Sequence, residues 1–199
     1  MTSVANTFVA NFKHATNTMS RLPPLSIDRL TPEQEKLYQE IMRTRSKGLD
    51  GPFGVWLRKP SVGEPCEKLQ NAFRLNGTLD RRVAELLILV VAREWTAQYA
   101  WQLHEQLALK AGLAPATIDA IRNRQKPTTL LEDEKSVYDV ASELITTRRV
   151  SRSTFDSALS ALGEDKLIEV VSAVGFYTMV CMTLNAFEVP NVEGAAPLI

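Results

Sequence analysis

The chain has 199 residues, of which 45% are hydrophobic and 23% are charged, a composition typical of a soluble globular protein with one full core. Lysine plus arginine number 23, as do aspartate plus glutamate, so the formal net charge is zero. This balance argues against nucleic acid as the main partner, because binding to phosphates requires an excess of positive charge. It also leaves no strong charge repulsion against self-association.

The N-terminal segment shows no sustained periodicity, and we expect residues 1–22 to form a flexible arm. Several serines and threonines precede Asp28, the first acidic residue, as in a transit peptide. Lys13 and Arg21 nevertheless supply too little positive charge for such a peptide. No apolar run approaches the roughly 20 residues that cross a bilayer, so we expect a cytoplasmic protein without a membrane partner.

The first helix signal is Thr31-Pro32-Glu33-Gln34, which combines an N-cap, a proline in the first turn and a capping box closed by glutamine. This helix is expected to stop near Gly48. Residues 51–60 are predicted to be a loop that carries two large apolar side chains, Phe53 and Trp56.

A second capping box is predicted from Ser61 and Glu64, at the start of a helix that ends at Asn76-Gly77. The next helix, from about Leu79 to Trp95, is apolar on all sides in its middle, which predicts a central buried helix. Another helix runs from Ala97 to Ala111 and closes at Gly112.

The second half continues in the same style. A short helix opens at Pro115, and longer ones are predicted over 132–148, 151–162 and 165–187. The last of these is apolar around most of its circumference. We therefore predict an all-α helical bundle over residues 23–190, followed by a tail at 191–199. Its two apolar helices need more cover than the other helices supply, which favours a subunit interface.

Glu85 is the residue that most needs a chemical explanation, because it stands at the start of a long apolar run. Burying an unpaired carboxylate costs several kcal/mol. A salt bridge to Arg81, Arg82 or Arg93 would be one explanation, and a role in a site would be another.

A helical face on the following helix carries Ala97, Ala100, Trp101 and His104. One interpretation is a pocket in which the alanines leave space before His104 and the indole forms a wall. The other is a tight helix crossing in which the imidazole bonds a backbone carbonyl. Since Cys66 and Cys181 lie in no metal or redox spacing, we expect two reduced, partly buried thiols, and no metal site.

These segments together resemble the carboxymuconolactone decarboxylase family, which includes the alkylhydroperoxidase D proteins. The central resemblance lies in 81–93 (RRVAELLILVVAR), 99–104 (YAWQLH) and 108–113 (ALKAGL). Softer similarity extends to 51–56 (GPFGVW) and to 170–180 (VVSAVGFYTMV). The resemblance thus covers roughly residues 20–190, and it implies an all-helical fold that assembles as a trimer or hexamer.

The same resemblance implies a site. Peroxidase members place a C-x-x-C pair one turn before a histidine, with a glutamate on the preceding helix. Here Glu85 and His104 match, whereas Ala97 and Ala100 stand at the two cysteine positions. Without a thiolate there, thiol peroxidase activity is not expected.

The decarboxylase branch of the family implies a reaction without cofactor on a small unsaturated lactone acid, with an aromatic-derived acid as a related possibility. We interpret His104 as the general acid-base residue and Glu85 as its partner. The substrate contacts that this interpretation predicts are Arg93 or Arg58 for the anion, with Tyr99, Trp101, Phe53, Trp56, Ala97 and Ala100 in the pocket. Two alternatives stay open: another proton-transfer reaction, and a non-catalytic oligomeric binding or scaffold protein of the same fold.

Overall fold

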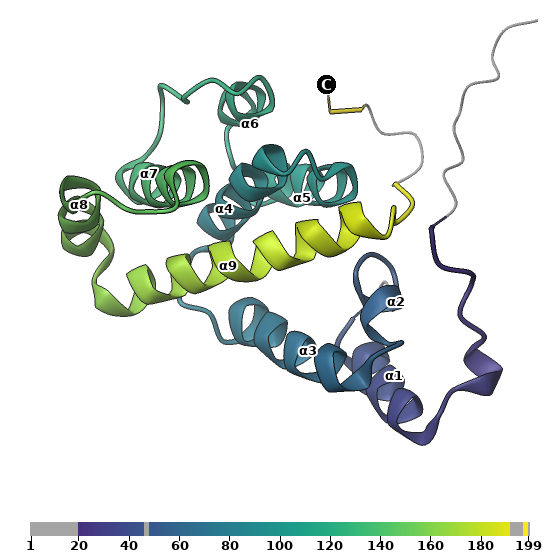
Figure 1. Cartoon of the computed structure of the whole chain (residues 1–199). Coiled ribbons are helices and arrows are strands. Elements are labelled where there is room, and N and C mark those ends of the chain that lie inside the picture. Colours follow the sequence, from purple (N-terminus) through teal and green to yellow (C-terminus); the bar gives the residue numbers. More distant parts are fainter. Residues whose placement is uncertain (1–19, 46–47, 192–196, 199) are drawn as a thin grey trace, which may run out of the picture.

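The computed structural model describes residues 20–45, 48–191 and 197–198, and helices are the only regular secondary structure in these parts of the chain (Figure 1). The α-helices are α1 (Pro32–Thr44), α2 (Phe53–Trp56), α3 (Pro60–Leu75), α4 (Arg81–Glu94), α5 (Gln98–Lys110), α6 (Pro115–Arg122), α7 (Glu132–Thr147), α8 (Arg152–Leu162) and α9 (Glu164–Ala186). A 3₁₀ turn, Ile27–Arg29, precedes them. The predicted all-α fold is confirmed. The arm expected at residues 1–22 lies outside the described residues as far as residue 19.

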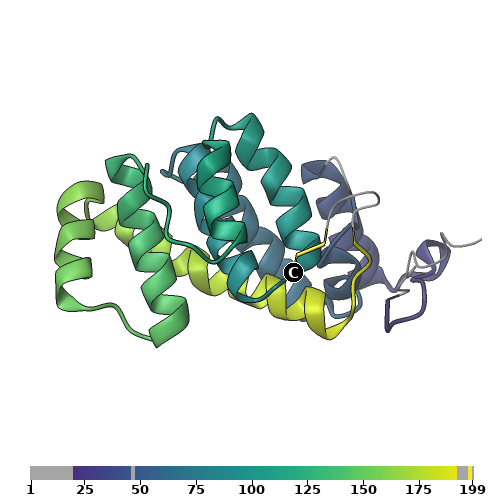
Figure 2. The same cartoon turned by 90° about the horizontal axis from the view of Figure 1, so that it is seen from above.

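The long helix α9 crosses the whole molecule, with α4 to α7 on one side of it and α1 to α3 on the other (Figure 1, and from above in Figure 2). Helix α4 is the central element, because it contacts α5, α6, α7 and α9. Every residue of α4 from Leu86 to Ala92 is buried, as its all-round apolar sequence predicts. Each fully buried leucine contributes roughly 1.5–3 kcal/mol of transfer free energy to the core.

The start of α1 matches its prediction, since Thr31 accepts from the backbone of Gln34 and the Gln34 side chain accepts from the backbone of Thr31. The end does not lie near Gly48. The helix stops at Thr44, because Arg45 leaves the helical region with φ −129° and ψ 122°. That exit turns the Arg45 side chain toward α3, where it meets Gln70.

Two predictions in the following segment are wrong. The predicted loop 51–60 contains α2, because one helical turn buries Phe53 and Trp56 together, with ring centroids 5.2 Å apart. The predicted capping box of Ser61 and Glu64 does not form either. Pro60 occupies the first turn of α3 and Lys59 its cap position, so Ser61 lies inside the helix and Glu64 pairs with Lys68 instead.

The prediction that no segment is long enough to span a membrane also needs correction. Helix α9 has the length and apolar composition of a candidate span, although polar residues interrupt its apolar sequence. Half of its most apolar stretch is buried inside the molecule, where it packs against α3, α4, α5, α7 and α8. A core helix of a soluble protein gives the same signal.

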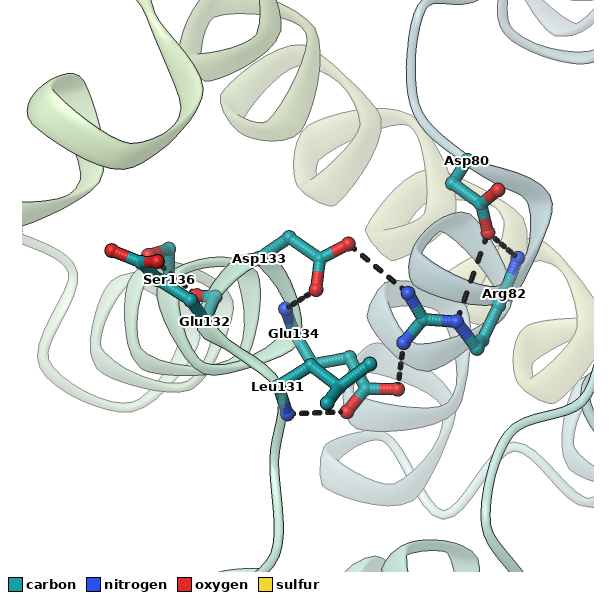
Figure 3. Close-up of polar contacts among 7 residues, drawn as sticks. All are labelled: Asp80, Arg82, Leu131, Glu132, Asp133, Glu134 and Ser136. Carbon is teal, nitrogen blue, oxygen red and sulfur yellow. Dashed lines mark hydrogen bonds and ion pairs between the residues drawn. The ribbon is translucent and has the colours of Figure 1, made fainter.

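The N-terminal end of α4 is fixed to that of α7 by a cluster around Arg82 (Figure 3). The guanidinium pairs with Glu134, which is 4% exposed, and with Asp133 at 3.1 Å. Glu134 also accepts from the backbone N–H of Leu131, at 2.8 Å. Asp80 caps α4 by accepting from the backbone N–H of Arg82. The cluster thereby sets the position of α4, and with it the position of Glu85 one turn further on.

Candidate active site

Glu85 and His104 are brought together by the antiparallel pairing of α4 and α5. The turn between the helices places Thr96 at φ 46° and closes with a hydrogen bond from the N–H of Ala97 to the carbonyl of Ala92, at 2.8 Å. The two residues lie about equally far in sequence from Trp95, so the turn sets them opposite each other. The Glu85 side chain is fully buried, and its Oε2 lies 2.7 Å from Nδ1 of His104.

The partner of Glu85 defines the tautomer of the imidazole. A carboxylate accepts hydrogen bonds, so Nδ1 of His104 carries the proton and Nε2 is left as the acceptor in the neutral ring. The other carboxylate oxygen, Oε1, lies 2.5 Å from Nη2 of Arg81 in an ion pair without hydrogen-bond geometry. The buried acid is therefore balanced by one cation and one imidazole.

Tyr177 of α9 completes the surroundings of the imidazole. Its ring lies edge-on to His104, with centroids 5.8 Å apart and planes at 81°. Burial raises the pKa of the Tyr177 phenol well above its usual value, and the negative charge of Glu85 raises it further. The hydroxyl therefore stays protonated at physiological pH and is available as a hydrogen-bond donor.

A cavity of about 170 Å³ opens in front of this group. It is lined by Arg45, Gln70, Arg74, Arg81, Leu103, His104, Leu107 and Tyr177, which come from five different parts of the chain. Three of these side chains are guanidinium groups, whereas no acidic residue of the described part of the chain lines the cavity. The site therefore combines an imidazole with a positive electrostatic environment, which suits an anionic small molecule.

Two of the predicted substrate contacts, Arg58 and Tyr99, line a different and larger cavity of about 560 Å³. There Arg58 donates to the carbonyl of Pro23. Burial raises the pKa of the Tyr99 phenol, and the charge of Asp50 adds to this shift. The structure thus brings Arg58 and Tyr99 together, but not onto the wall of the His104 cavity.

The remaining predicted contacts are packing residues. Arg93 is 6% exposed and donates from Nε to the carbonyl of Arg122 at 2.6 Å, which ties α4 to α6. Trp101 is fully buried, donates to Glu105 at 3.2 Å and lies beneath the Arg122 guanidinium. Four others are buried in the core and do not line the cavity: Phe53, Trp56, Ala97 and Ala100.

Sequence reasoning did not assign the cavity residues Arg45, Gln70 and Arg74 to the site. Gln70 and Arg74 are four residues apart on α3, a spacing that places both on one face. No local signal connects that face with α5. Arg81, one turn before Glu85, was considered as its salt-bridge partner and makes that contact.

The described residues near this site offer few candidates for thiol chemistry or for binding a metal ion. Cys66 and Cys181 are both free and buried, and burial raises the pKa of the Cys181 thiol to about 12. Within the described residues, no three His, Cys, Asp or Glu side chains gather closely enough to hold a metal ion.

Comparison with known proteins finds a family model that matches part of the chain. Residues 60–143, which include α3 to α6 and most of α7, match the model of the carboxymuconolactone decarboxylase family. No curated protein matches the chain in sequence.

Two solved structures share the fold. A structure described as an alkylhydroperoxidase AhpD core, an uncharacterized peroxidase-related protein from Ralstonia eutropha, has a TM-score of 0.72 at 15% identity, covering 88% of this chain and 94% of its own. An uncharacterized peroxidase-related protein from a Silicibacter species has a TM-score of 0.70 at 14% identity, covering 96% and 100%. At this identity the likeness establishes the fold alone.

Proposed function

Because residues 60–143 match the model of the carboxymuconolactone decarboxylase family, we propose that the chain is a cofactor-independent acid–base enzyme, a decarboxylase or a related lyase or isomerase. Its substrate is a small unsaturated lactone acid or an aromatic-derived acid, and it acts in the cytoplasm. The observation that carries the proposal is the Glu85–His104 hydrogen bond of 2.7 Å beside a cavity with three guanidinium groups.

The proposed role of His104 follows from its free Nε2. In the neutral ring this nitrogen accepts a proton, and in the imidazolium it returns one, while Nδ1–H stays on the Glu85 carboxylate. The negative charge of Glu85 offsets the positive charge of the imidazolium. Glu85 thus holds the ring in one tautomer and one orientation, as a carboxylate that accepts from Nδ1–H does for catalytic histidines.

For a decarboxylation, the bond between the carboxylate and the substrate carbon breaks, and its electron pair moves into the conjugated carbonyl of the substrate. Carbon dioxide leaves, and the enolate that remains takes a proton at carbon from Nε2 of protonated His104. The ring then regains a proton from water, so each turnover consumes one proton. The protonated phenol of Tyr177 and the guanidinium of Arg81 are the donors proposed to stabilise the enolate oxygen.

Thiol peroxidase activity is not proposed, although both structural neighbours are described as peroxidase-related. Ala97 and Ala100 carry no thiol, and they are 0% and 2% exposed at the start of α5. Cys66 and Cys181 lie on α3 and α9, and neither lines the His104 cavity.

The test is an assay of carbon dioxide release and ultraviolet absorbance against a panel of carboxylated unsaturated lactones and aromatic acids. We expect release by the native protein and a loss of about 10²–10⁴-fold in His104→Ala. His14→Ala, which removes the other histidine of the chain, is the matched control. Equal turnover in His104→Ala and the native protein would refute the acid–base mechanism.

The alternative of a non-catalytic scaffold makes a different prediction. A scaffold needs no buried carboxylate held against a cavity-lining imidazole, so this pair favours retained chemistry. If no acid on the panel reacts and His104→Ala is equally folded, the scaffold or an untested proton-transfer reaction becomes the better explanation.

Self-association as a trimer or hexamer is part of the same proposal. Large apolar side chains of α9 are exposed in the single chain, with Ile168 at 58%, Val171 at 43% and Met182 at 50%. Burying them in a subunit interface would remove this apolar surface from water. Light scattering coupled to gel filtration measures the mass directly, and a monomer at micromolar concentration would contradict the proposal.

A further inference from the structure

Arg45 and Arg74 form a pair of like charges on one wall of the His104 cavity, and neither has an acidic partner among the described residues. Burial lowers the pKa of the Arg45 guanidinium, and the charge of Arg74 lowers it further, so the two groups repel each other. An unpaired charge is costly to bury, and this cost falls on Arg45, the partly buried member of the pair, whereas Arg74 is exposed. The pair therefore favours a negative group that the described residues do not supply as an ion-pair partner.

Three other arginines show the contrast. Arg81 pairs with Glu85, Arg82 with Glu134 and Asp133, and Arg122 with Glu105. The chain thus supplies carboxylates to neutralise guanidinium groups elsewhere on α4 and α6. At Arg45 and Arg74 that neutralisation is missing, on the wall of the cavity that contains the imidazole.

Arg45 is also held rigidly in place before any ligand arrives. Its Nη1 donates to Oε1 of Gln70 at 2.6 Å, its Nε donates to the carbonyl of Gly48 at 3.2 Å, and its guanidinium lies 4.0 Å from the ring centre of Phe53. Because the Gln70 oxygen is used by Arg45, the remaining polar group of that amide is a donor. The wall consisting of Arg45, Gln70 and Arg74 therefore presents hydrogen-bond donors.

We propose that this wall is the binding subsite for a carboxylate that the substrate retains through the reaction. The inference rests on the proposed function in taking the His104 cavity as the substrate site. A carboxylate that leaves as neutral carbon dioxide would lose its attraction to two guanidinium groups during the reaction, so binding it here would raise the barrier. A retained carboxylate keeps these contacts in the substrate, the transition state and the product, and thereby fixes the reacting carbon near Nε2 of His104.

The consequence is that unreactive organic acids should bind as well. The test uses isothermal titration of the full chain with benzoate, a compact aromatic carboxylate, and with benzamide, its neutral counterpart, at low ionic strength. We expect the native chain to bind benzoate. Arg74→Gln and Arg45→Gln should each weaken that affinity at least tenfold. Benzamide should not bind measurably.

Arg43→Gln is the matched control, because this exposed arginine lies two residues from Arg45, pairs with Glu40 and does not line the cavity. It should bind benzoate as the native protein does. Arg74 is exposed, so Arg74→Gln decides the question even if Arg45→Gln fails to fold. Native affinity in Arg74→Gln, or equal binding of benzoate and benzamide, would overturn the subsite.

His104→Ala separates this inference from the proposed function. Since the subsite does not include the imidazole, benzoate affinity in His104→Ala should stay within threefold of the native value. Benzoate binding that depends on Arg74, together with turnover that does not depend on His104, would support the subsite and refute the acid–base mechanism. Turnover that depends on His104, together with benzoate binding that does not depend on Arg74, would support the acid–base mechanism and refute the subsite.

Discussion

Two neighbouring arginines at the start of α4 lead to opposite kinds of site. Arg82 points to Asp133 and Glu134 on α7, where each carboxylate also accepts from a backbone N–H, that of Glu134 or of the cap residue Leu131 (Figure 3). Arg81 points to Glu85, which passes its second oxygen to His104. In the first cluster both carboxylates of α7 are used by protein groups, although the side chains of Arg82 and Asp133 are 19% and 42% exposed. The second ends at a ring nitrogen that has no protein partner among the described residues, beside a cavity.

The difference teaches what a buried carboxylate in this fold does. Glu134 and Glu85 are 4% and 0% exposed, so burial alone does not distinguish them. Glu134 bonds groups that hold their protons permanently, an arginine and an amide, and its effect is to fix two helices. Glu85 bonds the imidazole of His104, and in the proposed mechanism its effect passes through that ring to the substrate.

Glu85→Gln and Glu134→Gln test this distinction with one chemical change in two places. Glu85→Gln should lower turnover roughly 10²–10³-fold, about 3–4 kcal/mol in the barrier, because the imidazolium loses its counter-charge. Glu134→Gln should leave turnover per folded molecule unchanged and lower the free energy of unfolding. The measurements are carbon dioxide release and urea denaturation of both variants. Equal loss of turnover in both would erase the distinction.

Arg82→Met removes the cation of the Arg82 cluster, whereas Glu134→Gln removes one of its negative charges. Removing the guanidinium leaves Glu134 buried without its cation, and we expect the free energy of unfolding to fall by about 3 kcal/mol. Urea denaturation measures the loss. Arg152→Met is the control, because Arg152 also forms an ion pair, with Asp156 at 2.7 Å, but the two side chains are 86% and 49% exposed. The control should cost roughly 1 kcal/mol or less. Similar losses in both variants would show that the Arg82 cluster is no more than a surface pair.

Tyr177→Phe tests the other site, that of Glu85 and His104. The phenol is proposed as one donor to the developing enolate, so its removal should lower kcat roughly tenfold, the weight of a single hydrogen bond, about 1.4 kcal/mol. Stability should change by less than about 1 kcal/mol, because Phe preserves the edge-on packing against His104. Tyr138→Phe, on α7 and away from the cavity, is the control for losing a phenol. An unchanged kcat in Tyr177→Phe would remove the donor from the mechanism.

The sequence predicted the helices and the central pair for different reasons. Helix starts and ends are local, and the capping box at Thr31 or the stop at Gly163 can be read from a few residues. Glu85 and His104 meet across a short turn between adjacent helices, so the family resemblance and the helix register together indicated their proximity. Their geometry then follows from two elements that are consecutive in the chain.

The cavity wall could not be read in the same way. Arg45 meets Gln70 across 25 residues, and Tyr177 reaches His104 from the last helix. Such contacts depend on how α3 and α9 dock, which no spacing within either helix reveals. Arg58 and Tyr99 illustrate the converse, because they were grouped with His104 and instead line a separate cavity beside Pro23 and Asp50.

The smallest expected effect concerns the buried cysteines. Their surroundings differ from those of both arginine clusters, because neither thiol has a charged partner or lines the His104 cavity. Burial raises the pKa of the Cys181 thiol from 9.0 to about 12. Between these values the unfolded chain binds fewer protons than the native one, so the free energy of unfolding falls as pH rises. We expect Cys181 to contribute a loss of roughly 1 kcal/mol by pH 10, so that the total loss is smaller by that amount in Cys181→Ala, measured by urea denaturation at pH 8 and pH 10. At neutral pH the native thiol should be unreactive toward a disulfide reagent and toward hydrogen peroxide. Rapid modification, or peroxide turnover that disappears in Cys181→Ala, would show that this fold retains thiol chemistry outside the position of the missing pair.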